Sequence, residues 1–300
     1  MKKDLATNSL QRGLELLSVL AQKPGGLTNS ELSRHLDIPR STCTYILTRM
    51  EADGYIVRNT TTGRYKVGLK TLAFARAALR EVGFHSLAES SLYRLAQETR
   101  LAAILGVLEG DRALIIDHIE SPEFIEDMAE RGRSRWPHYP SRDLRDAGSP
   151  LPLHASGIGR VLLAYQPETA LKELLNRIPL IKLTPKTTVS KQQLLEELVQ
   201  IRQQGYGLTD QLAHMDAQTV TAPIFDPEGN VRAAVSAAGS RTLPAFQDVP
   251  RIISLVQGAA REISKKLTQP AAADRDPDRQ LTVAAPVKNP KPKTKRRAAG

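Results

Sequence analysis

The feature that most constrains the fold is a series of short amphipathic segments at the N-terminal end, each closed by a helix-breaking residue. In the first segment leucines recur at spacings of four, three and three, which is typical of one stripe of a helix. These leucines are Leu10, Leu14, Leu17 and Leu20. The Pro-Gly-Gly sequence at 24–26 ends the segment.

A capping signal marks the start of a second, short helix. Thr28 stands at the N-cap position and Glu31 follows three residues later, the arrangement of a capping box. Leu32 and Leu36 are expected to face inward, and the Asp-Ile-Pro sequence at 37–39 ends the helix. The helix is therefore too short to be stable without a partner to pack on.

A third helix is predicted from Pro39 to Asp53, because proline suits a first helical turn and Gly54 is a common C-terminal stop. Its two faces differ in chemistry. The apolar face carries Cys43, Ile46, Leu47 and Met50. The opposite face carries Arg40, Ser41, Thr44, Tyr45 and Thr48, with Arg49 at the margin.

Two short alternating runs follow, at 55–58 and 64–67, joined by a polar loop at 59–63. This pattern is typical of a β-hairpin with a longer loop. Helix, short helix, tight turn, helix and hairpin together predict a winged helix-turn-helix domain over residues 8–68. A further helical pattern from Leu69 to Leu79 predicts a connecting helix within a linker at 69–82.

The rest of the chain mixes both kinds of element, which favours an α+β domain over residues 83–267. Strands are expected at 102–109, 113–119, 219–225 and 231–239, the last two joined by a turn at 227–229. Helices are expected at 86–99, 157–165, 167–178, 191–204 and 249–267. The stretch 131–149 is interpreted as a long loop and 268–300 as a disordered tail.

Charge is distributed unevenly along the 300 residues. Residues 1–80 carry a net charge of +7, residues 81–267 carry −2 and residues 268–300 carry +5. A basic end on a nearly neutral body indicates a polyanion partner for that end. The basic tail segment from Lys288 to Arg297 is either a source of nonspecific DNA affinity or a solubilising extension.

The third helix has the chemistry of a DNA recognition helix: short polar and basic side chains on one face, and a first turn whose amide groups favour phosphate. The residues expected to contact double-stranded DNA from this helix are Arg40, Ser41, Thr42, Thr44, Tyr45 and Arg49. Phosphate or minor-groove contacts are expected from Thr28 and, on the hairpin, Arg58, Arg64 and Lys66.

Three blocks of sequence resemble the IclR family of bacterial transcription regulators, in the family's order and over about residues 8–267. The segment 29–42 resembles its helix-turn-helix, and 54–58 with 62–68 its wing. The block 151–164, Leu-Pro-Leu-His-Ala-Ser-Gly-Ile-Gly-Arg-Val-Leu-Leu-Ala, resembles the start of its ligand-pocket helix. The blocks 205–210 and 222–226 resemble its C-terminal signature, although Gln211 and Leu212 stand where acidic residues are usual.

The resemblance implies a GAF-like, antiparallel-sheet effector domain that binds a small organic acid or related metabolite. It also implies a homodimer or homotetramer on a pseudo-palindromic operator, with RNA polymerase as a further candidate partner. The effector residues carried over are Ala155, Ser156, Gly157, Thr209, Asp210, Thr219 and Ser236. Amide groups at a helix start attract a carboxylate, and hydroxyl groups can orient it.

Signals for other classes of protein are weak. The six histidines show no metal-binding spacing, so no metal or cofactor is expected, and neither a Gly-x-Ser-x-Gly elbow nor a phosphate loop is present. We expect no catalytic residue, with His154 as a packing or capping group and Cys43 as an inert hydrophobe. An enzyme of the α+β domain, dependent on His154 or Asp210, and an architectural DNA binder without an effector remain as alternatives.

The expected cellular location rests on three signals that the sequence lacks: paired cysteines, a membrane-spanning run and a secretory signal. A single cysteine excludes a disulfide framework, and no apolar run reaches the ~18–20 residues of a membrane span. No apolar stretch follows the N-terminal lysines, as a secretory signal requires. We therefore expect a cytoplasmic, nucleoid-associated protein with no membrane partner.

Overall fold

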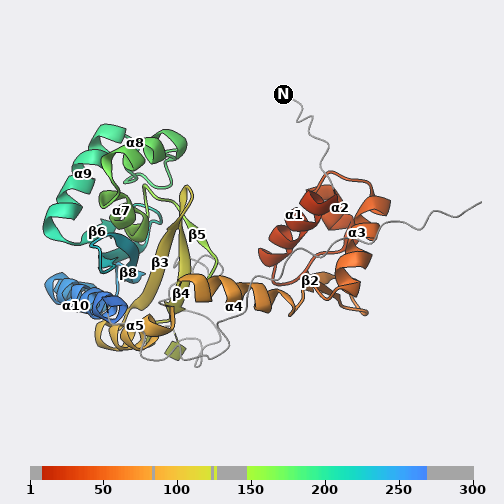
Figure 1. Cartoon of the computed structure of the whole chain (residues 1–300), viewed down its shortest axis with the longest axis horizontal. Coiled ribbons are helices and arrows are strands. Elements are labelled where there is room, and N and C mark those ends of the chain that lie inside the picture. Colours follow the sequence, from red (N-terminus) through yellow and green to blue (C-terminus); the bar gives the residue numbers. More distant parts are fainter. Residues whose placement is uncertain (1–8, 83–84, 123–124, 127–146, 269–300) are drawn as a thin grey trace, which may run out of the picture. The chain divides into compact units, whose positions relative to one another are not determined.

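The computed structural model describes residues 9–82, 85–122, 125–126 and 147–268 (Figure 1). Within these ranges the chain forms a small helical head with a two-stranded hairpin, and an α+β body built on one antiparallel sheet. Most of the stretch 131–149, the expected long loop, and all of 269–300, in the expected basic tail, lie outside the described residues. The last described helix runs to Thr268, where the tail was expected to begin.

The head is a winged helix-turn-helix, as predicted. The two strands pair antiparallel with Ile56 opposite Val67, and Leu27 adds an isolated bridge to Tyr65. The elements are α1 (Ser9–Ala21), α2 (Asn29–His35), α3 (Arg40–Ala52), β1 (Ile56–Arg58) and β2 (Tyr65–Val67). A connecting helix, α4 (Thr71–Val82), follows, with the Phe74 ring stacked on Tyr55 at 5.9 Å between centroids.

The core of the head differs in one respect from the predicted pattern. Leu16 and Leu20 of α1 are buried, but Leu10 and Leu14 are 70% and 57% exposed. The predicted helix is present, but its four leucines do not form one buried stripe, because only Leu17 and Leu20 contribute to the head core. α1 therefore has two apolar faces, and the one that carries Leu16 and Leu20 is buried. The spacing of leucines could not distinguish these faces, because both satisfy helical periodicity.

The predicted capping box at the start of α2 is confirmed, and the wing reinforces it. The Thr28 amide donates to Glu31 Oε2 at 2.7 Å, and the Glu31 amide donates to Thr28 Oγ1 at 3.3 Å. Arg64 of the wing lies 3.4 Å from Glu31 and donates to the Gly26 carbonyl at 2.7 Å. The hydrogen bonds from Thr28, backbone first, together with Arg64 hold the pKa of Glu31 below its usual value.

The body is a six-stranded antiparallel sheet in the order β5-β4-β3-β8-β7-β6. The four longer strands coincide with the four predicted ones, while β5 and β6 were not predicted. The bounds are β3 (Ala102–Glu109), β4 (Arg112–Ile119), β5 (Pro150–Leu151), β6 (Gly207–Asp210), β7 (Ala217–Phe225) and β8 (Val231–Ser240).

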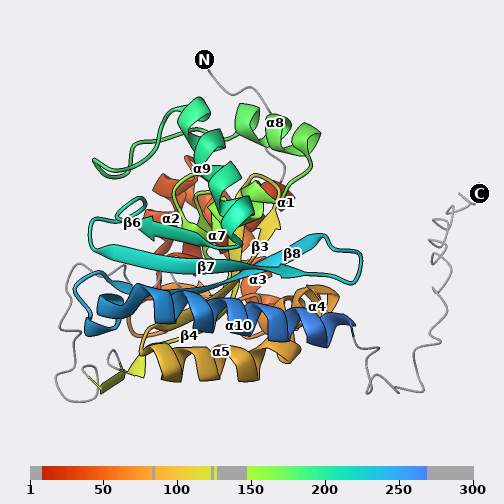
Figure 2. The ribbon, with the colours of Figure 1, turned by 90° about the vertical axis from the view of Figure 1, so that its left-hand side faces the viewer.

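Helices cover both faces of this sheet (Figure 2). One face packs against α5 (His85–Thr99) and α10 (Val249–Thr268), and the other against α7 (Gly157–Ala164), α8 (Glu168–Arg177) and α9 (Lys191–Gln204). A 3-10 turn, η2 (Pro244–Asp248), precedes α10. All five predicted helices of the body are present, and no end differs by more than one residue.

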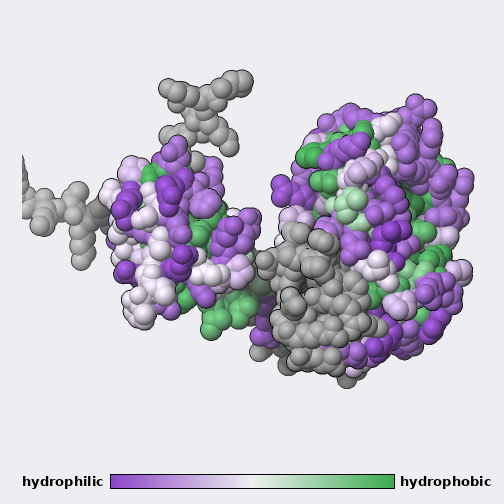
Figure 3. Space-filling view, turned by 180° about the vertical axis from the view of Figure 1, so that it is seen from behind, coloured by the Kyte–Doolittle hydropathy of each residue, from purple (hydrophilic) through white to green (hydrophobic). Residues whose placement is uncertain are grey.

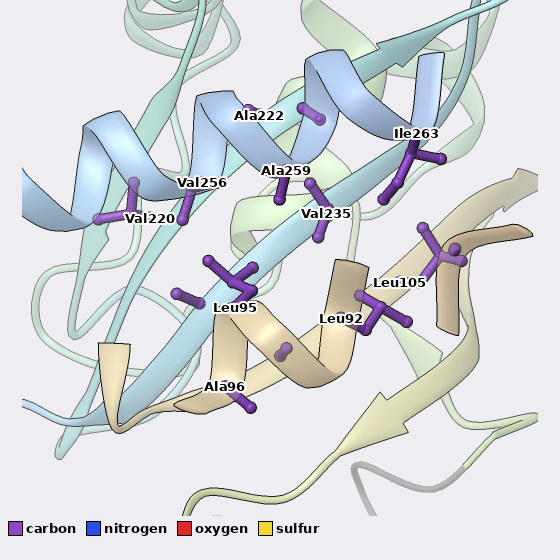
Figure 4. Close-up of a cluster of buried hydrophobic side chains, with 14 of the residues drawn as sticks. Leu92, Leu95, Ala96, Leu105, Val220, Ala222, Val235, Val256, Ala259 and Ile263 are labelled. Carbon is purple, nitrogen blue, oxygen red and sulfur yellow. The ribbon is translucent and has the colours of Figure 1, made fainter. Parts of the chain in front are cut away.

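Along each strand, successive side chains point alternately into the two layers of helices that cover the sheet. Val220 and Ala222 of β7 and Val235 of β8 point into the core formed with α5 and α10 (Figure 4). Their neighbours Thr219 and Ser236 face the α7 side instead, because successive side chains of a strand point to opposite faces. The α7 layer therefore combines an apolar core with a few polar positions on the sheet.

Thr28→Val removes the capping hydroxyl, and we expect it to lower the stability of the head by about 1 kcal/mol. Because the pKa of Glu31 is lowered in the folded state, the stabilisation involving its carboxylate is present above the ordinary value of 4.5. This stabilisation is lost as the pH falls through the lowered pKa. The difference in stability between Thr28→Val and the wild-type protein should therefore become smaller in acid.

Urea unfolding followed by circular dichroism between pH 3 and 7 measures this effect. Thr60→Val, in the exposed wing loop, is the matched control and should change stability by less than about 0.5 kcal/mol. A deficit for Thr28→Val that is equally large at pH 3 and pH 7 would contradict the assignment.

Candidate functional site: the recognition helix and the effector cavity

The outer face of α3 is polar and exposed, and its inner face is buried. Cys43, Ile46 and Leu47 pack in the head core, where burial raises the pKa of the Cys43 thiol. On the outer face Tyr45 is 59% exposed. The other exposed predicted residues of this helix are Arg40, Ser41, Thr44 and Arg49, while Thr42 is half-buried.

Contacts within this face order several of its side chains. The Thr44 hydroxyl donates to the Arg40 carbonyl at 2.8 Å and accepts a hydrogen bond from Asn29 Nδ2 at 2.6 Å. The Arg49 guanidinium lies 5.7 Å from the centre of the Tyr45 ring, a cation–π contact. Asn29 was not singled out from the sequence, because its contact with α3 depends on the crossing of two helices.

The residues beside α3 divide into two groups. Arg58, which lies over the Tyr65 ring at 5.6 Å, and Lys66 are exposed on the wing. Thr28 and Arg64, by contrast, are engaged in the capping box and the wing contact described above. These two residues hold the head together, and any contact they make with a ligand is additional to that role.

A cavity of about 620 Å³ lies on the α7 side of the sheet. Six of the seven predicted effector residues line it: Ala155, Ser156, Gly157, Thr209, Thr219 and Ser236. They come from the start of α7 and from β6, β7 and β8, three consecutive strands that are adjacent in the sheet and follow α7 by about fifty residues.

Hydroxyl groups form the polar side of this cavity. Thr209 Oγ1 and Thr219 Oγ1 are 2.6 Å apart, and the Thr221 hydroxyl donates to Ser236 Oγ at 3.0 Å. Gly157 lies directly over them, and a Cβ atom at this position would collide with the hydroxyls of Thr219 and Thr221. Glycine is therefore required for α7 to start this close to the sheet.

The start of α7 presents amide groups to the cavity. The Ser156 hydroxyl is the N-cap: it accepts from the Gly159 amide at 3.0 Å and donates to the Pro152 carbonyl at 2.8 Å. The amides of Gly157 and Ile158 precede the first intrahelical bonds, and neither has a hydrogen-bond partner among the described residues. Two such donors at the positive end of a helix attract an anion.

The structure places Asp210 outside this cavity, which corrects the prediction made for it. Asp210 pairs with Lys186 at 2.5 Å and with Arg241 at 3.4 Å, and it borders a separate, polar depression with Leu208. Since β6 alternates, Thr209 faces the cavity and its neighbour Asp210 faces away. The strand itself was not predicted, so its register was not available from the sequence.

His154 is 3% exposed and lines the cavity, where its Nε2 lies 2.9 Å from the Ile181 carbonyl. This bond ties the strand–helix junction to the loop after α8, which forms another wall with Ile178 and Leu183. A ring nitrogen held by a carbonyl suits the packing role expected for this histidine.

An ion pair holds α7 against α9. Arg160 is 4% exposed, and its guanidinium pairs with the Glu197 carboxylate, which also accepts from the Thr188 hydroxyl at 3.1 and 3.2 Å. Burial lowers the pKa of Arg160 to about 10. Sequence reasoning missed this pair, because the partners lie 37 residues apart on helices whose packing is set by the sheet.

Known proteins resemble both the head and the body of this chain. Family models described as the IclR helix-turn-helix domain and the bacterial transcriptional regulator IclR C-terminal domain match residues 9–60 and 137–265. The HTH-type transcriptional regulator BhcR of Paracoccus denitrificans is 32% identical over 256 residues, covering 85% of this chain and 86% of the relative. The transcriptional repressor IclR of Escherichia coli is 28% identical, covering 85% and 88%.

Solved structures share the fold. IclR of Thermotoga maritima aligns with a TM-score of 0.67 at 25% identity, covering 87% of this chain and 99% of that one. An IclR homolog from Microbacterium hydrocarbonoxydans, complexed with 4-hydroxybenzoate, aligns with a TM-score of 0.72 at 24% identity, covering 87% and 99%.

A winged helix-turn-helix head joined to an antiparallel-sheet domain with a polar-sided cavity defines a ligand-responsive, DNA-binding transcriptional regulator. The chain belongs to the IclR family of these regulators. In the part of the chain that the structure describes, no helix is long and apolar enough to cross a membrane.

Glu197→Gln leaves the buried Arg160 charge without its partner, and we expect a loss of about 3 kcal/mol in the free energy of unfolding. Glu196→Gln is the matched control: Glu196 is exposed on the same helix and accepts from Gln192 at 3.3 Å, so its replacement should cost less than about 0.5 kcal/mol. Urea unfolding of both variants makes the comparison. Equal losses would show that Glu197 does not stabilise Arg160.

Proposed function

We propose that the protein binds a pseudo-palindromic operator as a dimer, and that a carboxylate bound in the cavity changes its affinity for that operator. The observation that carries the proposal is the joint presence of an exposed Arg/Ser/Thr face on α3 and a cavity with free helix-start amides. The domain limits expected from the sequence, 8–68, 69–82 and 83–267, are retained in this proposal.

DNA contact is assigned to the outer face of α3. Arg40 and Ser41 stand in its first turn, where recognition helices reach base edges and phosphates. Arg49, stacked on Tyr45, is placed to pair with a guanine, an interaction whose loss costs about 1–3 kcal/mol. Arg58 and Lys66 on the wing supply phosphate contacts.

A dimer is supported by the second apolar face of the head. Leu10 and Leu14 on α1, together with Leu69, Leu72 and Phe74 around α4, are all more than half exposed. Figure 3 shows apolar residues, in green, on one face of the head among mostly hydrophilic and intermediate ones. A second copy would cover this surface and supply the second half-site contact that a single head lacks. Dimers could pair further into tetramers.

The effector is assigned to the polar side of the cavity. The Gly157 and Ile158 amides would hold the carboxylate, and the hydroxyls of Thr209, Thr219 and Ser236 would orient it. We propose that effector binding changes how the two DNA-binding heads of the dimer are placed relative to each other. The protein would act in the cytoplasm, on nucleoid DNA, with RNA polymerase as a further partner.

A regulatory role rather than a catalytic one is also part of the proposal. The two residues on which an enzyme was expected to depend do not form a site: His154 is bonded to the Ile181 carbonyl, and Asp210 is paired with Lys186 and Arg241 outside the cavity.

Arg40→Ala combined with Arg49→Ala should reduce operator affinity by roughly thirtyfold or more, because each arginine contributes about 1–3 kcal/mol. Footprinting upstream of the protein's own operon locates the operator, and fluorescence anisotropy measures affinity and the number of chains bound. We expect two chains or a multiple of two, and a steep decrease of affinity with salt.

Arg177→Ala is the control for loss of positive charge, since Arg177 is exposed at the end of α8 in the body. It should leave the affinity unchanged. Wild-type affinity in the Arg40/Arg49 variant would refute the assignment of α3 as the recognition helix.

Thr219→Val should weaken carboxylate binding roughly 10- to 100-fold, the effect of losing a hydrogen bond to a charged group. Thr242→Val is the control: it is the same substitution in the same domain, at an exposed residue just after β8 that does not line the cavity. Titration calorimetry with organic acids compares the two variants. Equal effects would indicate a general change in packing and would contradict the site.

A further inference from the structure

The cavity also has an apolar lining, which the binding of a carboxylate group does not account for. Apart from the hydroxyls and the α7 amides, its wall is mostly aliphatic. This wall is made by Ile104, Ile115, Leu151, Leu153, Ile178 and Ile181, with Leu183 and Leu212 beside them. The apolar side chains come from β3, β4, β5 and the loop after α8, so they surround the cavity rather than form one patch.

The size of the cavity is large for a small acid. A volume of about 620 Å³ holds roughly twenty water-sized groups. A two- or three-carbon acid would occupy a quarter of that space or less. The remainder would be water against aliphatic side chains, which is unfavourable because apolar surface gains free energy when it leaves water.

Two wall residues remain exposed although they border the cavity. Ile181 is 56% exposed and Leu183 is 45% exposed. Their loop is fixed by the His154 bond to the Ile181 carbonyl and by the Thr187 hydroxyl, which accepts from the Leu183 amide at 3.1 Å. The loop therefore holds apolar surface at the cavity where a bound molecule can cover it.

The ionisable side chains of the described lining already have partners within the protein. Arg112, on the lining, lies 3.3 Å from the Asp111 carboxylate beside it. Of the two histidines, His154 is bonded to a carbonyl and His214 Nδ1 accepts from the Asp216 amide at 3.4 Å. Among the described lining residues, no unpaired arginine or lysine faces a second carboxylate.

We propose that the cavity takes a monocarboxylate with an apolar body of about six to ten carbon atoms, a size that fills about half of such a volume. Ile181 and Leu183 are the residues that select for this body. The inference rests on the proposed function, because it places the carboxylate at the start of α7.

The test uses the purified full-length protein and the sodium salts of linear acids from propionate to decanoate, below the concentrations at which they form micelles. Titration calorimetry should show the dissociation constant decreasing about fourfold for each added methylene group up to about eight carbons. A dissociation constant that is independent of chain length, or lowest for propionate, overturns the inference.

The combined variant Ile181→Ser with Leu183→Ser should reduce this dependence on chain length while leaving butyrate affinity within twofold. Val199→Ser is the matched control, because Val199 is 54% exposed on α9 and does not line the cavity. It should leave the whole series unchanged. If the Ile181/Leu183 variant keeps the wild-type dependence of the dissociation constant on chain length, or if Val199→Ser changes it equally, these two residues do not select the ligand. Either result overturns their proposed role.

Matched alcohols separate this inference from the proposed function. If octanoate binds at least tenfold more tightly than octanol, and both series gain with length, the carboxylate site and the apolar selection both hold. Octanol that binds as tightly as octanoate overturns the carboxylate site but not the apolar wall. Thr219→Val that weakens every acid equally, in a series that shows no gain with length, supports the carboxylate site and overturns the apolar selection.

Discussion

The close approach of α7 to the sheet is the constraint on which the effector domain depends. Gly157 starts the helix directly over the hydroxyls of β7, where a side chain of any size would collide. This contact brings two amide donors and a set of hydroxyl groups to one end of a cavity that is otherwise aliphatic. The ion pair between Arg160 and Glu197, one turn further along, secures the same helix from its other side. Helix, sheet and site are therefore fixed together.

Much of this architecture could be predicted from the sequence because it depends on local patterns. The capping box at Thr28, the turn chemistry around the wing and the long apolar strands are each encoded within a few residues. Six cavity-lining positions were also among the residues predicted through resemblance to a family whose motif contains the glycine and its neighbours. Such positions are recognisable because the close approach at Gly157 tolerates no other residue type.

Other features depend on contacts that no local pattern records. Asp210 and Thr209 are adjacent in sequence, and only the register of a four-residue strand decides which of them meets the cavity. The leucines of α1 satisfy helical periodicity on two faces, so the buried face is decided by α2 and α3. The Ile181 wall and the contact of Asn29 with Thr44 arise from packing between separate elements. In each case the tertiary structure supplies the information.

The exposure of the connecting helix α4 affects how the chain responds to proteases. From Leu72 to Ala78 every residue is exposed, and a helix of about three turns has little intrinsic stability in water. In a single chain, whose α4 is not covered by a second copy, these backbone hydrogen bonds open more readily than those of the buried helices, and proteases would cleave here before they attack either core. Such a cut would release two fragments that each retain an intact hydrophobic interior.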